Sequence, residues 1–351
     1  MKCIRTKRVR VKDKHIPVLK DMARQVNYVW NFLNELSHYA ITLNHAWLSG
    51  YDLQDKTNGY SKCEGVILHS TTIQQVCEEY ATRRDQFRKK KLTWRCSDRK
   101  KSNYSLGWIP FKKGAVKYRN GQIHIKGYHF GMWDSYGLGD FELRSGSFSE
   151  DARGRWYLNV QVEVDVPESE GSAILGIDPG LKTAATCSDG DKLEPRWFCA
   201  YQEKLAKAQR KNKKKRVRAI HAKVKNTRAD DMHKFTTQKV YDSAEIYTGD
   251  VSSKKFAKSP MAKMTYDASW GMFRRMLEYK CTGAGVRFKV INEAYTSQTC
   301  SACGTIPASS PKGKAGLKIR QWKCCNCGAE HDRDINAACN IAKRGHALSG
   351  V

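Results

Sequence analysis

Three acidic residues in this sequence are candidates for metal-dependent chemistry. Asp178 ends the apolar run AILGI and begins a Pro-Gly turn, Glu293 ends the strand-like run GVRFKVIN, and Asp334 lies in HDRDINAACNIA. Two hard divalent ions that act on one phosphate require several oxygen ligands converging on it, as in nucleases of the RNase H type. An Asp in a turn or at a helix start is often only a turn residue or a cap, and a strand-end Glu is often only an exposed residue. The spacing alone leaves both interpretations open.

Four cysteines form a second group with ligand spacing. Cys300 and Cys303, and then Cys324 and Cys327, make two C-x-x-C pairs separated by twenty residues, and Gly follows each pair. Two such pairs present four thiolates tetrahedrally, and soft sulfur ligands select zinc over magnesium. We therefore predict one structural zinc ion, with an iron–sulfur site or chance clustering as the alternatives. The total of 13 cysteines is odd, which argues against a disulfide framework.

The composition predicts a polyanionic partner. The 351 residues include 63 Lys and Arg against 35 Asp and Glu, a formal net charge of +28, which is more than solubility requires. Nine Trp, 16 Tyr and 11 Phe are interleaved with the basic residues and could stack on bases. Nucleic acid is the expected partner, and a basic protein that is merely soluble is the alternative. No secretory leader or membrane-spanning run is evident, so we expect a cytoplasmic protein without a membrane partner.

The N-terminal half changes periodicity along its length. Residues 2–13 alternate as in a strand, and residues 17–44 carry apolar side chains at helical spacing. A second helix is expected to begin with Ser70 or Thr71 as its cap and to end in a basic turn. Residues 94–166 contain short β segments separated by turns with Gly, which favours a small barrel or sandwich.

Two basic segments are candidates for contact with nucleic acid. Residues 204–228 contain twelve Lys or Arg, no acidic residue, and too few apolar residues for a deep core. Residues 83–91, around the end of the second predicted helix, form either a solvated face or one that contacts phosphates. The predicted contact residues are Arg83, Arg84, Arg88, Lys204, Arg210, Lys213, Lys214, Arg216 and Arg218.

Five motifs together resemble the TnpB family, the RNA-guided nucleases of insertion-sequence transposons that are related to compact type V CRISPR effectors. They are SLGWIPFK from Ser105, GIDPGLKTAAT from Gly176, DASWGMFRRMLEYK from Asp267, YTSQTCSACG from Tyr295 and HDRDINAACNIA from His331. The resemblance covers most of the chain and implies an α/β RNase H-like (RuvC) nuclease domain with an inserted zinc ribbon. It also implies an N-terminal wedge β-barrel that carries an inserted α-helical recognition region. The boundaries implied are 1–15 and 94–170 for the wedge, 16–93 for the recognition region, 171–351 for the nuclease domain and 295–330 for the ribbon.

The same resemblance implies a catalytic triad of Asp, Glu and Asp, whose first and last members match Asp178 and Asp334. The middle Glu normally ends the strand that reads AEIYTGDVSS in this chain, where Gly249 takes its place. Asp250 follows, but period-two alternation turns it to the opposite face of the strand. Glu293 stands where the family motif normally has Pro, and this resembles a branch with a rearranged catalytic Glu. We therefore predict that Glu293 is the third member.

The function implied is RNA-guided cleavage of double-stranded DNA, with two catalytic magnesium ions held by Asp178, Glu293 and Asp334. A guide RNA transcribed from the transposon would select the target by base pairing, and the protein would recognise a short motif beside it. We expect a monomer on one guide RNA, associated with the nucleoid of a prokaryote. The Gly at position 249 leaves a nuclease-inactive, RNA-guided DNA-binding repressor as the alternative. A transposase that itself moves DNA is less favoured, because no Tyr or Ser nucleophile motif accompanies the acidic residues.

Overall fold

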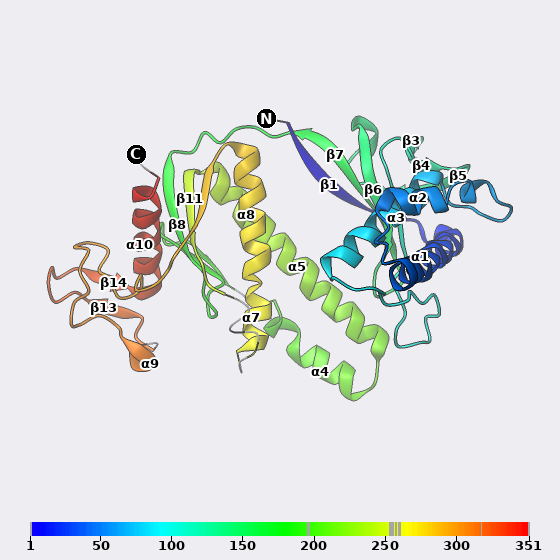
Figure 1. The fold of residues 1–351 in the computed structure, drawn as a ribbon. Coiled ribbons are helices and arrows are strands. Elements are labelled where there is room, and N and C mark those ends of the chain that lie inside the picture. The colour runs from blue at the N-terminus through cyan, green and yellow to red at the C-terminus, as the bar shows by residue number, and fades with distance from the viewer. Residues whose placement is uncertain are drawn as a thin grey trace. The chain divides into compact units, whose positions relative to one another are not determined.

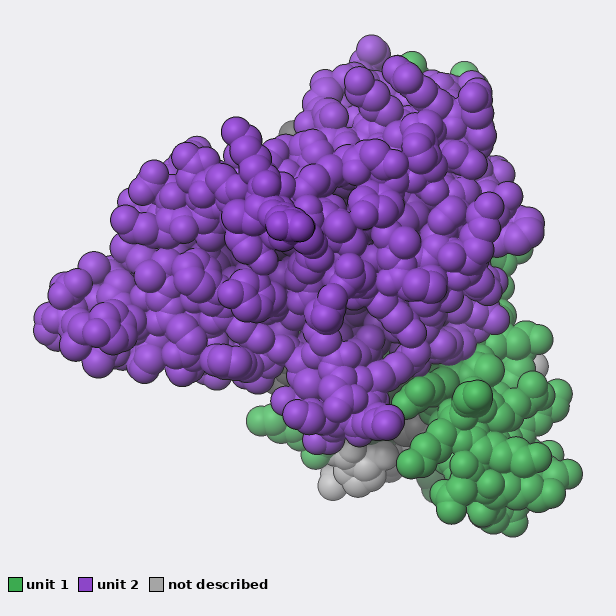
Figure 2. Space-filling model, turned by 90° about the vertical axis from the view of Figure 1, so that its right-hand side faces the viewer, with its two compact units in different colours: residues 1, 165–351 green, residues 2–164 purple. Residues whose placement is uncertain are grey.

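The protein consists of two compact units, which are coloured separately in Figure 2. In the computed structural model, the N-terminal unit comprises residues 2–164, and the C-terminal unit comprises residues 165–351 together with residue 1. Each unit has its own sheet and its own hydrophobic core. The structure describes residues 2–194, 197–252, 256, 258, 261–316 and 318–349. Within these ranges, no helix has the length and apolar character that crossing a membrane would require.

The N-terminal unit is built on a seven-stranded sheet in the order β2-β6-β7-β1-β5-β4-β3. In the strand β7, every second residue from Trp156 to Val162 is buried, which is the pattern of a strand with one face on a core. The predicted strand at residues 2–13 is confirmed by β1. The strands are β1 (Lys2–Val11), β2 (Trp108–Phe111), β3 (Lys117–Arg119), β4 (Gln122–Ile125), β5 (Tyr128–Trp133), β6 (Leu143–Glu150) and β7 (Trp156–Asp165).

Three α-helices lie between β1 and β2 in the chain. The helix predicted at residues 17–44 is confirmed as α1 (Ile16–Asn44), with Pro in its first turn, where no backbone hydrogen bond is lost. The predicted cap of the next long helix is wrong, because the ring Nδ1 of His69, and not Ser70 or Thr71, accepts a hydrogen bond from the Thr71 N–H at 3.2 Å. The other helices are α2 (Gly50–Lys56) and α3 (Ser70–Gln86), with short 3₁₀ turns η1 (Asp13–His15), η2 (Tyr60–Lys62) and η3 (Leu138–Asp140).

The C-terminal unit is built on a five-stranded sheet in the order β10-β9-β8-β11-β12. β11 lies between β8 and β12 and is parallel to both, whereas β9 returns antiparallel to β8 and β10 pairs antiparallel with β9. The carboxyl ends of the three parallel strands therefore meet at one edge of the sheet. The strands are β8 (Ala173–Asp178), β9 (Ala185–Cys187), β10 (Lys192–Leu193), β11 (Ser243–Gly249) and β12 (Arg287–Ile291).

Alternation along these strands sends neighbouring side chains to different helices. Leu175, Ile177 and Ile246 pack in the large core with α5 (Lys214–Tyr241) and α8 (Trp270–Ala284). The residues in between face α10 (Arg333–Ala347), because a Cβ on Gly176 would overlap the Ala338 carbonyl of that helix. Figure 1 shows α10 lying along β8. The remaining elements are α7 (Ala262–Ala268), α9 (Gly313–Gly316), η4 (Cys199–Tyr201), and the two-stranded sheet of β13 (Gln321–Lys323) and β14 (Glu330–Asp332).

The basic segment at residues 204–228 forms a helical hairpin of α4 (Gln202–Arg210) and the first half of α5. Asn212, with a φ of 49°, lies in the turn between the helices, a left-handed conformation that Asn adopts more easily than most residues. Leu205, Ala208, Ile220 and Val224 anchor the hairpin in the core of the unit. The basic side chains are left on its outer faces.

Candidate active site and metal centre

The ends of the parallel strands bring Asp178, a predicted site residue, and Gly249, which stands in place of the family's Glu, to one edge of the sheet. Asp178 is the last residue of β8, and Gly249 is the last residue of β11. The register pairs Thr248 with Ile177 and Gly249 with Ile291, so Asp178 and Gly249 lie side by side. Both have the strand parity of residues that face α10.

Glu293 lies two residues beyond the end of β12 and turns back over Gly249. A Cβ built on Gly249 would overlap the Glu293 carboxylate oxygen Oε2 and would lie 3.0 Å from Pro179 Cδ. The carboxylate thus fills the space that a side chain at position 249 would occupy. Glycine at that position is what allows Glu293 to lie there.

The backbone around Glu293 is held on both sides. Arg344 of α10 donates to the carbonyls of Asn292 at 3.2 Å and of Ala294 at 2.7 Å. Asp250 has a supporting place, since its Oδ1 accepts a hydrogen bond from the Glu293 N–H at 3.2 Å. The strand-end turn is therefore fixed by hydrogen bonds to its backbone, and these do not involve the Glu293 carboxylate.

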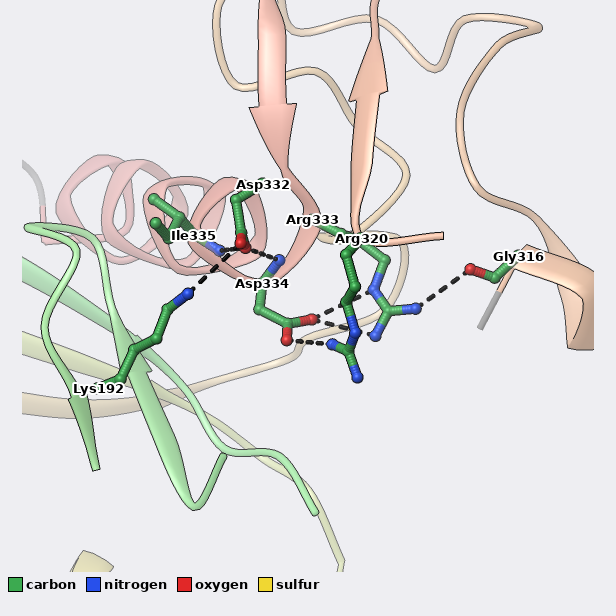
Figure 3. Close-up of polar contacts among 7 residues, drawn as sticks. All are labelled: Lys192, Gly316, Arg320, Asp332, Arg333, Asp334 and Ile335. Carbon is green, nitrogen blue, oxygen red and sulfur yellow. Dashed lines mark hydrogen bonds and ion pairs between the residues drawn. The ribbon is translucent and has the colours of Figure 1, made fainter. Parts of the chain in front are cut away.

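Asp334 lies at the start of α10, but it is not the cap of that helix. Asp332 is the cap, and its Oδ1 accepts hydrogen bonds from the backbone N–H groups of Asp334 at 2.9 Å and Ile335 at 3.1 Å (Figure 3). The Asp334 carboxylate instead points to two guanidinium groups. Oδ2 pairs with Arg320, and Oδ1 accepts from Arg333 Nε at 3.2 Å and Nη2 at 3.1 Å.

The three carboxylates line one cavity of about 540 Å³, and the pKa values of Asp178 and Glu293 are both raised there. The pKa of Asp178 is well above its usual range because of burial and then because of the negative charges of Asp334 and Glu293, while Arg333 and Arg320 oppose the shift. Burial and then Asp250 also raise the pKa of Glu293. Glu293 Oε2 is buried and has no hydrogen-bond partner among the described residues.

This carboxylate set fits a divalent cation, but it is not a preformed cage. An orphaned buried oxygen and mutually repelling acids are both stabilised when a hard cation binds. Among the described residues, however, the four cysteines are the only group of three or more His, Cys, Asp or Glu whose ligand atoms all lie within 4.8 Å of one another. The two arginines on Asp334 account for the difference, because they occupy the oxygens that a metal would take.

The four predicted zinc ligands come together in the C-terminal unit. The sulfur atoms of Cys300 and Cys327 are 3.6 Å apart, and those of Cys303 and Cys324 are 3.8 Å apart. A tetrahedral site with Zn–S bonds of about 2.3 Å has sulfur–sulfur edges of about 3.8 Å. The cluster therefore suits a structural zinc ion. His331 lies beside it, with Nε2 3.0 Å from the Cys300 sulfur.

The cysteine cluster is tied to α10 by two asparagines one turn apart. The Nδ2 groups of Asn336 and Asn340 each donate to the carbonyls of Thr296 and Thr299, at 2.7–3.3 Å. The Asn336 Oδ1 accepts from the Ser301 N–H at 2.8 Å. Through these bonds the segment between Glu293 and the first cysteine follows the helix that carries Asp334.

The predicted nucleic-acid contacts divide into exposed and buried residues. Arg84 is 1% exposed, donates to the hydroxyl of Ser37 at 2.8 Å, and pairs with Asp85 at 3.0 Å. It is therefore an internal structural cation and is not placed to bind phosphate. The other eight residues are exposed: Arg83, Arg88, Lys204, Arg210, Lys213, Lys214, Arg216 and Arg218.

Sequence reasoning did not find Arg320 and Arg333. Arg333 lies between the two aspartates of HDRD, so its place in the motif was a signal that could have been used. Arg320 is separated from Asp334 by fourteen positions, and only the pairing of β13 with β14 brings the two together.

Comparisons with known proteins agree with this architecture. Residues 270–341 match the family model "Cas12f1-like, TNB domain". A protein of Streptomyces pristinaespiralis, named "Putative RNA-guided DNA endonuclease", is 31% identical over 302 residues, which cover 80% of this chain and 73% of that relative. The chain belongs to the TnpB-like family of RNA-guided DNA endonucleases.

Two further relatives show how far the similarity extends. "Putative RNA-guided DNA endonuclease InsQ" of Escherichia coli (strain K12) is 30% identical over 226 residues, 56% of this chain and 55% of that relative. The solved structure titled "Cryo-EM structure of the Cas12f1-sgRNA-target DNA complex" superposes with a TM-score of 0.59 at 13% identity, over 94% of this chain and 83% of that one. The similarity to this solved structure shows a shared fold.

Zinc content tests the assignment of the cysteine cluster in this TnpB-like protein. We expect one zinc per chain by plasma mass spectrometry, and its loss in Cys324→Ser. Removal of the metal should increase hydrogen exchange across residues 300–332 and leave the N-terminal unit unchanged, because four metal–thiolate bonds hold that segment. Exposed Cys325 offers the matched control, since Cys325→Ser should keep the zinc. Unchanged exchange after complete removal of the metal would contradict the assignment.

The raised pKa of Asp178 predicts that Asp178→Asn stabilises the protein in magnesium-free buffer. A carboxyl whose folded pKa is raised contributes its full stability below its unfolded pKa, and this contribution is lost as pH rises. The variant should therefore be more stable than wild type at neutral pH, where the wild-type carboxyl has to ionise in a buried site beside other negative charges. Denaturant titration should show the difference shrink on acidification. A difference that grows toward low pH would contradict the electrostatic account.

The arginines on Asp334 predict competition with the metal. Arg320→Gln should tighten Mn²⁺ binding about fivefold, measured by electron paramagnetic resonance, because a partly buried ion pair worth about 1 kcal/mol no longer opposes it. Exposed Lys182 lines the same cavity, so Lys182→Gln removes equal charge there and should have a smaller effect. Equal changes in both variants would show that only general charge matters.

Proposed function

We propose that this protein is an RNA-guided DNA endonuclease whose metal site is formed by Asp178, Glu293 and Asp334. The observation that carries the proposal is the Glu293 carboxylate over Gly249, at the edge where β8 ends in Asp178. Gly249 at the end of β11 has no side chain, and the carboxylate of Glu293, from the segment after β12, takes its place. This relationship gives the site a third acidic ligand.

Magnesium bound by these carboxylates would activate water and stabilise the leaving oxygen in phosphodiester hydrolysis. The residues of the chain supply the arrangement. Asp178 and Glu293 approach from the strand ends, and Asp334 approaches from the first turn of α10. Arg320 and Arg333 neutralise the site when it holds no metal, and they are cations within reach of a phosphate that enters the cavity.

The proposal assigns an RNase H-like fold to the C-terminal unit, with a zinc ribbon inserted. The strand order supports the RNase H-like fold. β10 pairs antiparallel with β9 and β9 with β8, and the parallel strands β11 and β12 follow. The position of the cysteine cluster between β12 and α10 supports the inserted zinc ribbon. We further propose a wedge at residues 1–15 and 94–170, a recognition region at 16–93, and a nuclease domain at 171–351 that includes the ribbon at 295–330.

The proposed partners are a guide RNA and a double-stranded DNA target, bound by one protein chain. The net charge of +28 supports a large polyanionic ligand. The exposed basic faces of the α4–α5 hairpin and of residues 83 and 88 are the proposed contacts. The alternative of a nuclease-inactive repressor rests on Gly249, and the Glu293 carboxylate over that residue favours the nuclease.

Cleavage of a labelled DNA duplex by protein co-expressed with its flanking RNA tests the proposal. Wild type should cut in magnesium, and Glu293→Gln should bind the duplex but lose at least about a hundredfold in rate, since one metal ligand is gone. Asp250→Asn is the matched control, because Asp250 is the nearby acid whose oxygen contacts the Glu293 backbone. It should keep most of the activity. A wild type that binds target DNA without cutting would instead support the repressor.

A relocation experiment makes the same test sharper. Gly249→Glu alone should fail, because its side chain overlaps the Glu293 carboxylate. Gly249→Glu combined with Glu293→Ala should recover part of the cleavage, since the ligand then comes from β11. Full activity of Gly249→Glu alone would mean that the space is not filled by Glu293.

A further inference from the structure

A second cavity, of about 570 Å³, lies in the N-terminal unit, where the end of α3 and the segment after it meet α1 and β2. Its walls are aromatic and its edge is cationic. Trp30, Phe87 and Trp108 line it together with Arg83, Lys89 and Arg95. All of these lie within one unit and far from the carboxylates in the sequence.

A ladder of asparagines on α1 holds one wall of this cavity in place. Asn31 makes a reciprocal pair with the backbone of Arg95, donating to its carbonyl at 2.9 Å and accepting from its N–H at 2.8 Å. Asn34 makes the same pair with Leu92, at 2.8 Å each way. Asn27 accepts from Arg95 Nε at 2.6 Å. Because these positions recur at helical spacing, one face of α1 binds an otherwise irregular segment.

The hydrogen bonds from these asparagines hold Arg95 beside two indole rings. Its guanidinium carbon lies 5.7 Å from the ring centre of Trp30 and 5.8 Å from that of Trp108. Arg95 therefore offers a positive charge at the wall of the cavity, beside the two indole rings.

Phe87 forms the open side of the cavity. It is the C-cap of α3, and its side chain is 57% exposed. Arg88, which follows, has a φ of 48°, so the chain turns sharply there. An aromatic ring held at a helix end beside basic residues is a surface on which a planar ligand can stack.

We propose that this cavity binds one unpaired nucleotide of a single-stranded nucleic acid, an inference that rests on the proposed function. A base offers a planar face for Phe87, and its carbonyl and ring-nitrogen acceptors suit the guanidinium of Arg95, which lines the cavity. The adjoining phosphates suit Lys89 and Arg83, although Arg83 Nε also pairs with Glu79 at 2.7 Å. Stacking and phosphate contact are the same for RNA and DNA, so the strand type is left to the experiment.

Photocrosslinking locates the contact. The full chain is irradiated with a short single-stranded RNA that carries 5-bromouridine, or with a DNA that carries 5-bromodeoxyuridine, and crosslinked peptides are identified by mass spectrometry. We expect crosslinks to the peptides that contain Trp30, Phe87 or Trp108, and the arm that crosslinks identifies the strand. Crosslinks confined to other peptides in both arms would overturn the inference.

Affinity measurements separate stacking from charge. Phe87→Ala should weaken binding of the crosslinking strand about tenfold, the usual effect of losing one stacked base, and should leave binding of an abasic strand unchanged. Tyr51→Ala removes an aromatic side chain that is 82% exposed outside the cavity, and it should have no effect on either strand. Equal losses in both variants, or an equal loss on the abasic strand, would overturn the inference.

These readouts do not depend on cleavage. A chain that binds through the cavity but never cuts DNA would contradict the proposed function and support the cavity. If the wild-type chain cuts its target but Phe87→Ala binds the strand normally, the proposed function is supported and the cavity proposal is contradicted.

Discussion

The close packing of α10 on β8 is the constraint on which the rest of the C-terminal unit depends. Gly176 has no side chain, and Ala338 and Ala342 offer only methyl groups, so the helix backbone lies directly against the strand. A Cβ on Gly176 would lie 2.7 Å from the Ala342 backbone nitrogen, too close for a real contact. Any larger residue would push the helix outward. This contact brings the first turn of α10, and with it Asp334, to the edge where β8 ends in Asp178.

That packing also concentrates negative charge, and the protein offsets the charge locally. Burial and the charge of Asp250 raise the free energy of ionising Glu293, and burial with the charges of Asp334 and Glu293 raises the free energy of ionising Asp178. Arg320 and Arg333 lower this free energy by pairing with Asp334. A divalent cation in this cavity would lower it more strongly, because it carries twice the charge of a guanidinium group. The segment that carries the cysteine cluster is connected to this cavity in two ways. Arg320, which pairs with Asp334, directly precedes β13, and the asparagines of α10 hold the residues before Cys300.

Local patterns in the sequence were enough to predict the long helix at residues 17–44, the strand that ends in Asp178 and the pairing of the two C-x-x-C motifs, because each depends on periodicity or spacing alone. What the sequence left open depends on contacts between distant positions. Whether Asp332 or Asp334 caps α10 is decided by side-chain direction, and Arg84 is buried because Ser37 and Trp47 surround it. The overlap of Glu293 with the space above Gly249 requires the register of β11 on β12, which no single segment encodes.

Anomalous diffraction from Mn²⁺-soaked crystals of the wild-type protein tests the central claim, that Glu293 completes a metal site with Asp178 and Asp334. The account predicts an anomalous peak at coordination distance, about 2.1 Å, from the carboxylate oxygens of both Asp178 and Glu293. The peak should weaken in Glu293→Gln crystals and persist in Asp250→Asn crystals. A peak held by Asp178 and Asp250, with Glu293 beyond coordination distance, would contradict it.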